Sequence, residues 1–470
     1  MEPKMNAPQK RSVSRSGAAA RLRLTTALYA SVWRWHFYAG LIFAPFIIIL
    51  AVSGSVYLFK PQIESYLYKD MLTVREVGAS PLSADEIVAR TIKAYPGTSV
   101  SSVTYSDDPA ATLKLGASRD GVSQTLYADP YTGHIRGILE NDKTFAAFFK
   151  KMHSELVIGG TWANRLVELA ACWAIILTLS GLYLWWPRNK SAIWGTILPR
   201  LSKPGSRQFW RDLHAVPAFW LSIGIIVLIL SGLPWSGVVG KQINKVATAT
   251  HTDYPQYALS FAAKPDSVTV TKDIADDVPW AAEQLPVPES AAGDYIRLDV
   301  EEISGIAERQ QIARPYTISM PWGERGVYTI ATSHSRPGDN ATLHVDQYSG
   351  AVLTDVRYAD YGWMAKAITL GIALHEGRLF GLANQLFGLI VALGLILISI
   401  SSYVMWQKRK PAGKLGAPAR PKDKRVTLGV LAIMIVCGLI MPLVGVSLII
   451  VLALDLLFLR RVKRLQHWFG

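Results

Sequence analysis

The stretch WRWHFYAGLIF, Trp33 to Phe43, decides the fold because it opens the first of several long apolar runs. The chain has 470 residues, of which 50% are hydrophobic and only 18% are charged, and its mean hydropathy is +0.22. A soluble domain would carry closer to a quarter of charged residues. A helix crosses a bilayer with about 20 apolar residues. We therefore expect an integral membrane protein.

Four apolar blocks are each long enough to cross a bilayer once, and a fifth is longer. We place the four spans at residues 36–59, 153–186, 214–239 and 367–406. The second and fourth ranges include a short outer segment that leads into the span. The fifth block, residues 426–459, predicts a helical hairpin that turns near Pro442 to Gly445. The predicted fold class is thus a membrane α-helical bundle of four primary spans with a C-terminal hairpin.

Basic residues are concentrated in the segments that this pattern places on one side of the membrane, which are residues 1–35, 187–213, 407–425 and 460–470. Lysine and arginine are retained on the cytoplasmic side, so the N-terminus is expected inside and residues 60–152 and 240–366 outside. The net charge of +14 mostly reflects this bias. We therefore expect the lipid bilayer, and no nucleic acid, as a partner.

The chain repeats its own plan. The interval from His36 to Ser53-Gly54 equals the interval from His214 to Ser231-Gly232. Each outer segment has a predicted helix, SADEIVARTIKA or DVEEISGIAERQ, followed by strand-like runs that end in a Tyr-Thr-Gly or Tyr-Ser-Gly turn. A second histidine follows each turn, His153 in the first half and His375 in the second. This indicates an internal duplication of a span, an outer α+β module, a histidine and a span.

The halves differ in one stretch. Between Gly232 and Ile303 the second half has additional residues, which we interpret as an insertion in its outer module. Asn164 and Asn384 also match across the halves and are expected to cap or bridge helices.

The WRWHFYAG opening, the YTG and YSG turns, and the LHEGRLFG stretch with its looser copy MHSELVIGG resemble the PepSY-associated transmembrane family. This family includes iron-regulated, PiuB-type inner-membrane proteins and siderophore reductases. The resemblance covers roughly residues 30 to 410. It implies a bacterial inner-membrane protein with two periplasmic PepSY modules and two haems b, some members of the family reducing ferric siderophores.

The positions of the four repeated histidines lead to the same cofactor. His36 and His214 precede spans entered from the cytoplasm, and His153 and His375 precede spans entered from outside. Helical bundles build cofactor sites from side chains on facing helices, and a haem iron can be held by two imidazoles. Ionisable groups at membrane depth are by default functional. We therefore predict two haem b sites, with iron ligands His36 and His214 near the inner face and His153 and His375 near the outer face.

The neighbouring residues are less specific. Arg34 and Arg211 could bind haem propionates, but inside-positive loop charge explains them at least as well. A single histidine at a helix end is also commonly a hydrogen-bonded anchor. His134, His251, His334 and His344 have no repeated counterpart and are interpreted as ordinary residues.

No nucleotide-binding, P-loop, HExxH or CxxC motif is found, so any electrons must come from an unidentified cytoplasmic donor. The resemblance implies a haem-containing oxidoreductase that reduces a periplasmic ferric siderophore, which we expect to be held between the two outer modules. Reduction would release the iron because oxygen donors suit Fe(III) better than Fe(II). Two alternatives stay open. The protein could be a PepSY-type regulatory or binding protein without redox activity, or a metal or siderophore transporter.

Overall fold

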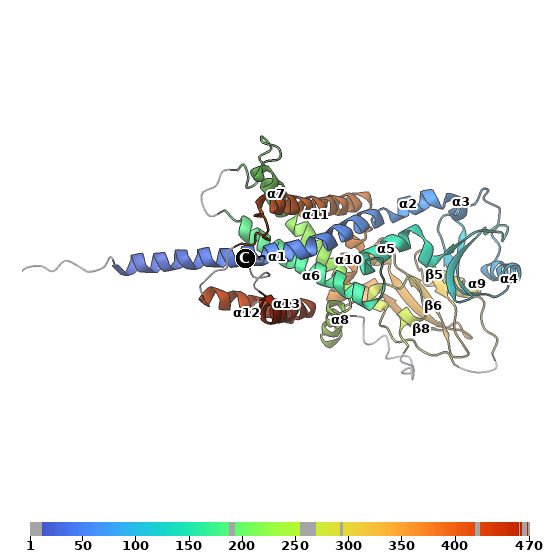
Figure 1. Ribbon diagram of the computed structural model, residues 1–470. Helices are drawn as coiled ribbons and strands as arrows, with labels where there is room; N and C mark the ends of the chain where they lie inside the picture. The colour runs from blue at the N-terminus through green and yellow to red at the C-terminus, as the bar shows by residue number, and fades with distance from the viewer. Residues whose placement is uncertain are drawn as a thin grey trace, which may run out of the picture.

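A helical bundle and a β-sheet domain lie at opposite ends of the protein, with helices connecting them (Figure 1). The computed structural model describes residues 12–187, 193–253, 269–291, 295–418, 424–459, 461–462 and 468. Parts of the predicted basic segments therefore lie outside the described residues, including residues 1–11, 188–192 and 419–423 and most of the predicted tail 460–470. Residues 254–268 and 292–294 of the predicted insertion also lie outside them.

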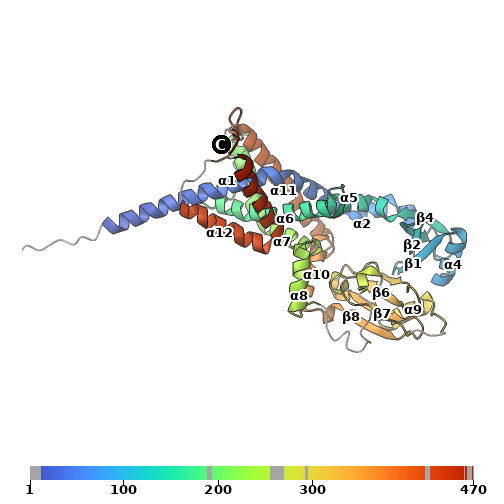
Figure 2. The ribbon, with the colours of Figure 1, turned by 60° about the horizontal axis from the view of Figure 1, so that its bottom comes forward.

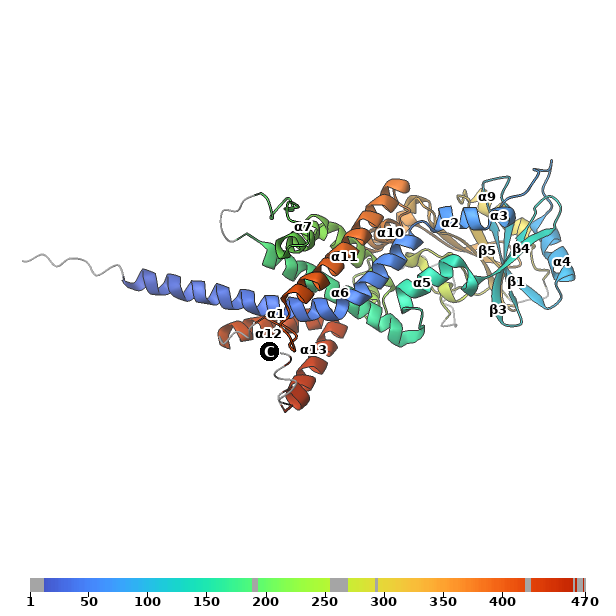
Figure 3. The same cartoon turned by 45° about the horizontal axis from the view of Figure 1, so that its top comes forward.

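Four helices of the described chain are long and apolar enough to cross a membrane. They are α1 (Ser12–Tyr57), α6 (Gly160–Trp185), α7 (Arg207–Gly232) and α11 (Leu382–Arg409). Helix α1 contacts α6 and α11, and α7 contacts the same two helices. Helices α1 and α7 therefore lie diagonally across the four-helix bundle from each other, and α11 appears between them in Figure 3.

Helix α1 is longer than the predicted span 36–59. It begins at Ser12, and its apolar part begins at Thr26. The preceding residues are mostly alanine, leucine and arginine, which are strong helix formers, and they contain no proline, so the helix extends without a break. His36 consequently lies inside a continuous helix rather than at its start.

The other predicted spans also change at their ends. Helix α7 begins at Arg207, ahead of the predicted start at His214, because the hydroxyl of Ser206 accepts a hydrogen bond from Phe209 N and caps it. The predicted segments 153–186 and 367–406 each contain the end of one helix and the whole of another. The short helices are α5 (Phe145–Glu155) and α10 (Trp363–His375), and each is followed by a turn with positive φ angles before the spanning helix begins.

The extramembrane domain contains one antiparallel sheet of eight strands in the order β4-β3-β2-β1-β5-β6-β7-β8. The strands are β1 (Thr98–Tyr105), β2 (Leu113–Arg119), β3 (Val122–Ala128), β4 (Ile135–Glu140), β5 (Tyr316–Ser319), β6 (Val327–Thr332), β7 (Ala341–Asp346) and β8 (Val352–Arg357). The first four strands and the last four thus occur in mirrored order. The α+β character predicted for both outer segments is confirmed.

The two outer segments are not separated by a gap where they meet. Strand β1 pairs with β5 from Ser102–Ser319 to Tyr105–Tyr316, so the sheet is continuous. Helices α4 (Ala84–Ala94) and α9 (Val300–Arg309) contact each other and share one buried core with both halves of the sheet. Main-chain hydrogen bonds and apolar side chains fill this seam, so a ligand held between the two modules stays a prediction without support from these contacts.

Each half of the sheet is connected to the bundle by its own helices, as Figure 2 shows. The first half follows α2 (Lys60–Leu67) and α3 (Lys69–Leu72) and returns through α5; the second follows α8 (Val239–Ala249) and returns through α10. The described part of the insertion crosses the second half of the sheet, where Thr271 Oγ1 lies 3.0 Å from His344 Nε2. It thereby buries a face that the first half leaves without such a cover.

The C-terminal apolar block forms two helices, α12 (Lys424–Ile440) and α13 (Pro442–Leu454), that contact each other. The turn lies at Met441, next to the predicted position, since proline is favoured in a first helical turn. At 17 and 13 residues, both helices are shorter than the four spans. Helix α13 is fixed to the bundle because Trp173 Nε1 donates to Ser447 Oγ at 3.1 Å.

Candidate functional site

His36 and His214 meet inside the bundle from diagonal helices. His36 is on α1 and His214 is on α7, and their ring centroids are 6.3 Å apart with an interplanar angle of 85°. His36 Nδ1 lies 2.9 Å from Ser180 Oγ on α6, and His214 Nδ1 donates to the carbonyl oxygen of Ile398 on α11 at 2.9 Å. Each ring is therefore anchored to a helix other than its own. The inner pair predicted from the sequence is brought together.

His153 and His375 form a second pair at the end of the bundle nearer the sheet. They lie on α5 and α10, and their ring centroids are 6.1 Å apart. His153 Nδ1 donates to Leu50 O at 3.0 Å, and His375 Nδ1 donates to Leu228 O at 2.8 Å. Both partners are carbonyls of the long helices α1 and α7. The outer pair predicted from the sequence is therefore also brought together.

All four histidines use Nδ1 for a hydrogen bond to the surrounding protein. At the inner site, the hydroxyl of Ser180 already donates to Leu177 O, so its oxygen accepts from His36. At the outer site the partners are main-chain carbonyls, which can only accept. These bonds fix the tautomer with hydrogen on Nδ1 and leave Nε2 with a free lone pair. A metal-binding histidine commonly uses its second nitrogen in this way.

The separation of the rings fits a metal between them. Two imidazoles that bind one metal ion through Nε2 would have ring centres roughly 6 Å apart. The observed centroid separations are 6.3 and 6.1 Å. An edge-to-face packing contact would also give such a distance. It would not explain why all four Nδ1 atoms have acceptors and all four Nε2 atoms are left available.

No group of three or more histidine, cysteine, aspartate or glutamate side chains in the described residues could hold a metal ion. A site with only two protein ligands needs a cofactor that supplies the others. Haem does so, because the porphyrin provides four equatorial nitrogens and leaves two axial positions for imidazoles. Two imidazoles from facing helices are a donor set that a haem iron could use, and haem at these pairs stays a prediction.

The Ser-Gly pairs that reveal the repeat contact the outer histidines. Ser53 Oγ and Ser231 Oγ each lie 3.2 Å from Nδ1 of His153 and His375, respectively. A Cβ atom on Gly54 would lie 3.1 Å from His153 Cε1, and one on Gly232 would lie 2.9 Å from His375 Cε1. From the sequence these residues are only markers of the repeat, and their contact with the rings was not predicted. Their constant spacing from the inner histidines was the signal that could have revealed it.

The repeated asparagines connect the short helices to the spanning ones, as predicted. Asn164 Nδ2 donates to Ser154 O at 3.3 Å, and Asn384 Nδ2 donates to Leu374 O at 2.9 Å. Each acceptor is the residue next to an outer histidine. The asparagines therefore hold the ends of α5 and α10 that carry the rings.

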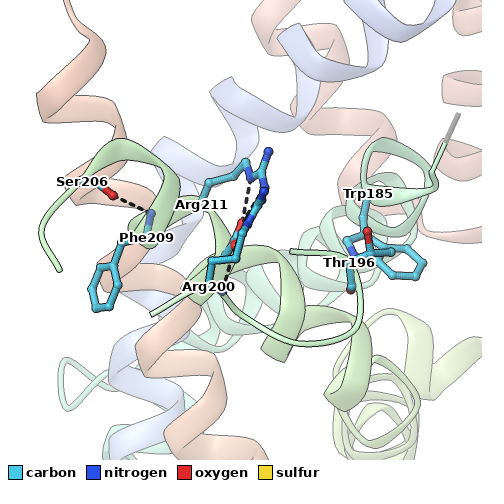
Figure 4. Close-up of polar contacts among 7 residues, drawn as sticks. Trp185, Thr196, Arg200, Ser206, Phe209 and Arg211 are labelled. Carbon is cyan, nitrogen blue, oxygen red and sulfur yellow. Dashed lines mark hydrogen bonds and ion pairs between the residues drawn. The ribbon is translucent and has the colours of Figure 1, made fainter. Parts of the chain in front are cut away.

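Arg34 and Arg211, the residues predicted to bind propionates, have protein partners. Arg34 Nη1 donates to Pro418 O at 2.5 Å. Arg211 and Arg200 both pair with Asp212, at 2.6 and 2.8 Å, and the Asp212 side chain is fully buried. Figure 4 shows Arg200 and Arg211 at the start of α7 and in the connection before it, where Trp185 Nε1 also donates to Thr196 O. A propionate-binding role for either arginine stays a prediction without support from these contacts.

His344 is a core residue of the sheet, as its lack of a repeated counterpart predicted. Its two ring nitrogens lie 3.0 Å from Thr271 Oγ1 and Thr329 Oγ1, and it is fully buried. Burial lowers the pKa of His344 to about 3. The ring is therefore neutral and connects the insertion to the sheet.

The fold and the paired histidines define a class of protein, a multi-pass membrane protein whose four-helix bundle carries a two-histidine site at each end. Within that class, the model of the family described as the PepSY-associated TM region matches residues 33–409. The chain belongs to this family, as the sequence motifs indicated. Among curated proteins, no match to the chain was found.

Proposed function

We propose that the chain is a haem b oxidoreductase of the bacterial inner membrane that delivers electrons to a periplasmic ferric siderophore for iron acquisition. The observation that supports this most strongly is the presence of two histidine pairs with every Nδ1 atom bound to the protein. When bound, haem would supply a one-electron carrier at each pair. The residues described above hold and orient the axial ligands.

The two pairs lie at different depths, which suits transfer across a membrane. The carbonyls of Leu50 and Leu228 accept from the outer rings, and each lies on the same long helix as an inner histidine. The interval is nearly four helical turns, and at about 5.4 Å per turn this is about 21 Å, a large part of a hydrocarbon core of roughly 30 Å. The inner pair would receive electrons from a cytoplasmic donor, and the outer pair would deliver them.

The outer pair lies at the end of the bundle that leads to the sheet domain. The rings of His375 and Trp235 are 6.3 Å apart between centroids, and Trp235 is 44% exposed. The described residues of the basic segments lie toward the opposite end, which supports a periplasmic location of the sheet domain. The mirrored strand order and the repeated histidine contacts support an origin of the two halves by duplication.

The first test is a reduced-minus-oxidised absorbance spectrum of the purified protein. We expect a b-type signal in the wild type and a reduced signal in His36→Ala and His375→Ala, each of which removes one axial ligand. His134→Ala is the matched control, because His134 is exposed on the sheet domain. If the wild type has no such signal, the redox function is wrong and a binding or regulatory role is favoured. If neither ligand variant changes it, the ligands are assigned wrongly.

The second test concerns the acceptor. Reduced protein is mixed without oxygen with a ferric hydroxamate, and haem absorbance is followed in time. One Fe(II) haem should be oxidised for each Fe(III) chelate reduced to Fe(II), and a ferrous chelator should capture the product. Metal uptake into vesicles without any reductant would instead support a transporter.

A further inference from the structure

Arg409, the last residue of α11, is a partly buried cation with an unused hydrogen-bond donor. Its guanidinium carbon lies 5.1 Å from the ring centre of Trp33 and 5.0 Å from that of Phe37. One of its nitrogens, Nη2, donates to Gly416 O at 2.9 Å. Its Nε is buried and has no hydrogen-bond partner among the described residues. The two aromatic rings and the carbonyl hold the guanidinium in one orientation, which prepares the remaining donors for a ligand.

Among the described residues, the positive charge of Arg409 has no carboxylate partner within 4 Å. Arg207 is close enough to act on it as a like charge. Asp212 neutralises Arg200 and Arg211 nearby. In the part of the chain that the structure describes, no carboxylate oxygen is within 4 Å of a charged nitrogen of Arg409 or Arg207. Arg207 is exposed, whereas Arg409 is partly buried, and partly burying a cation without a carboxylate partner is unfavourable unless an anion joins it.

Arg409 contacts residues that flank His36 on α1. Phe37, whose ring it covers, directly follows His36 on α1. The segment after α11 is attached across this end of the bundle, because Trp406 Nε1 donates to Leu415 O at 2.8 Å and Arg34 donates to Pro418 O. The guanidinium is thus fixed at the cytoplasmic-side end of the inner site. An anionic group extending from a cofactor between His36 and His214 is the ligand that this position suits.

We infer that Arg409, supported by Arg207, binds the carboxylates of the inner haem, in place of Arg34 and Arg211. Guanidinium matches carboxylate geometry with two parallel hydrogen bonds. This inference rests on the proposed function, since it requires a haem at the inner pair.

The test compares Arg409→Gln with Lys408→Gln, which removes an exposed positive charge from the neighbouring residue. A cation beside a haem favours the reduced, less positive state, so its loss lowers the midpoint potential. In a spectroelectrochemical titration we expect one of the two b-type waves of Arg409→Gln to shift down by about a tenfold change in the reduction equilibrium, which is about 59 mV for one electron. The other wave, and both waves of Lys408→Gln, should stay at the wild-type potentials.

Reconstitution with haem dimethyl ester, which has no free carboxylates, identifies the partner. The ester removes negative charge from both haems and should raise both waves. For the wave that Arg409→Gln lowers, we expect the size of this rise to differ between the wild type and Arg409→Gln, because Arg409 pairs with the carboxylates only in the wild type. Arg409→Lys, which keeps the charge but loses the planar fork, should lose only part of the effect and shows whether the position tolerates substitution.

The inference is wrong if Arg409→Gln titrates like the wild type, or if the effects of the ester and of Arg409→Gln are additive. Additive effects would indicate a different anion, such as a lipid phosphate, at Arg409. Failure of the proposed function is distinguishable, because the wild type itself would then show no b-type wave.

Discussion

The glycines that face the histidine rings provide a graded test of the ligand geometry. A Cβ atom would lie 2.9 Å from His375 Cε1 at Gly232, 3.1 Å from His153 Cε1 at Gly54, and 3.3 Å from His36 Cε1 at Gly181. Ordinary van der Waals contact begins near 3.4 Å. The ring of His375 would therefore have to move by about half an ångström, whereas that of His36 would move little. Overpacking of this kind costs about 1–3 kcal/mol.

The substitutions to alanine also change helix propensity. Alanine is favoured over glycine within a helix by about 1 kcal/mol. For Gly181→Ala this gain is expected to offset the small clash, so folding stability should be nearly unchanged. For Gly232→Ala the clash should exceed the gain and displace His375. We expect a loss of about 1–2 kcal/mol in the free energy of unfolding and a weakened outer ligand.

The assay combines low-temperature electron paramagnetic resonance of the oxidised protein with a haem-to-protein ratio. Gly232→Ala should alter the signal of one low-spin haem, Gly54→Ala should alter the same signal less, and Gly181→Ala should leave that signal unchanged. Gly429→Ala on α12 is the control, because a Cβ atom there meets nothing within 4 Å. If Gly232→Ala has the spectrum and haem content of Gly429→Ala, the ring of His375 is not where the argument requires it.

Three further predictions concern buried polar groups. Asp212→Asn should lower the free energy of unfolding by about 1–3 kcal/mol, as measured by thermal unfolding. This figure is reduced for solvent screening, because Arg200 and Arg211 are 33% and 53% exposed. Burial lowers the pKa of His344 to about 3. The wild type should therefore lose folding stability by about 1.4 kcal/mol per pH unit as the pH falls from about 6.5 toward 3. The stability of His344→Gln should depend less on pH in this range. Glu168 accepts from the first amides of α8 at 3.0 and 2.7 Å, so Glu168→Gln should weaken that cap by about 1–2 kcal/mol and speed hydrogen exchange there.

The spans and outer helices were predictable because their signals are local. An apolar run of bilayer length and a capping residue such as Ser83 or Asp299 act within a few residues, and α4 and α9 begin as predicted. The continuous sheet was not predictable in the same way. Pairing between β1 and β5 joins strands from opposite halves of the chain, and alternating side chains do not reveal which edges meet.

The histidine pairs were predictable because the repeat and the membrane topology together placed them at equal depth. Their hydrogen-bond acceptors were not. Three are main-chain carbonyls, including Leu50 and Ile398, which any residue type would supply. Arg409 was not predicted because it is one of many basic residues in the cytoplasmic segments. What distinguishes it is a buried Nε atom without a hydrogen-bond partner among the described residues.

The interval between His36 and Leu50 shows why the repeat must be exact in length. It makes nearly four helical turns, so the inner ring and the carbonyl that orients the outer ring lie on nearly the same face of α1. The interval between His214 and Leu228 on α7 is the same. Inserting a single amino acid in either interval would rotate one site by about 100° relative to the other and shift it by about 1.5 Å. One histidine pair would then separate even though every ligand was still present, so the two intervals are constrained together.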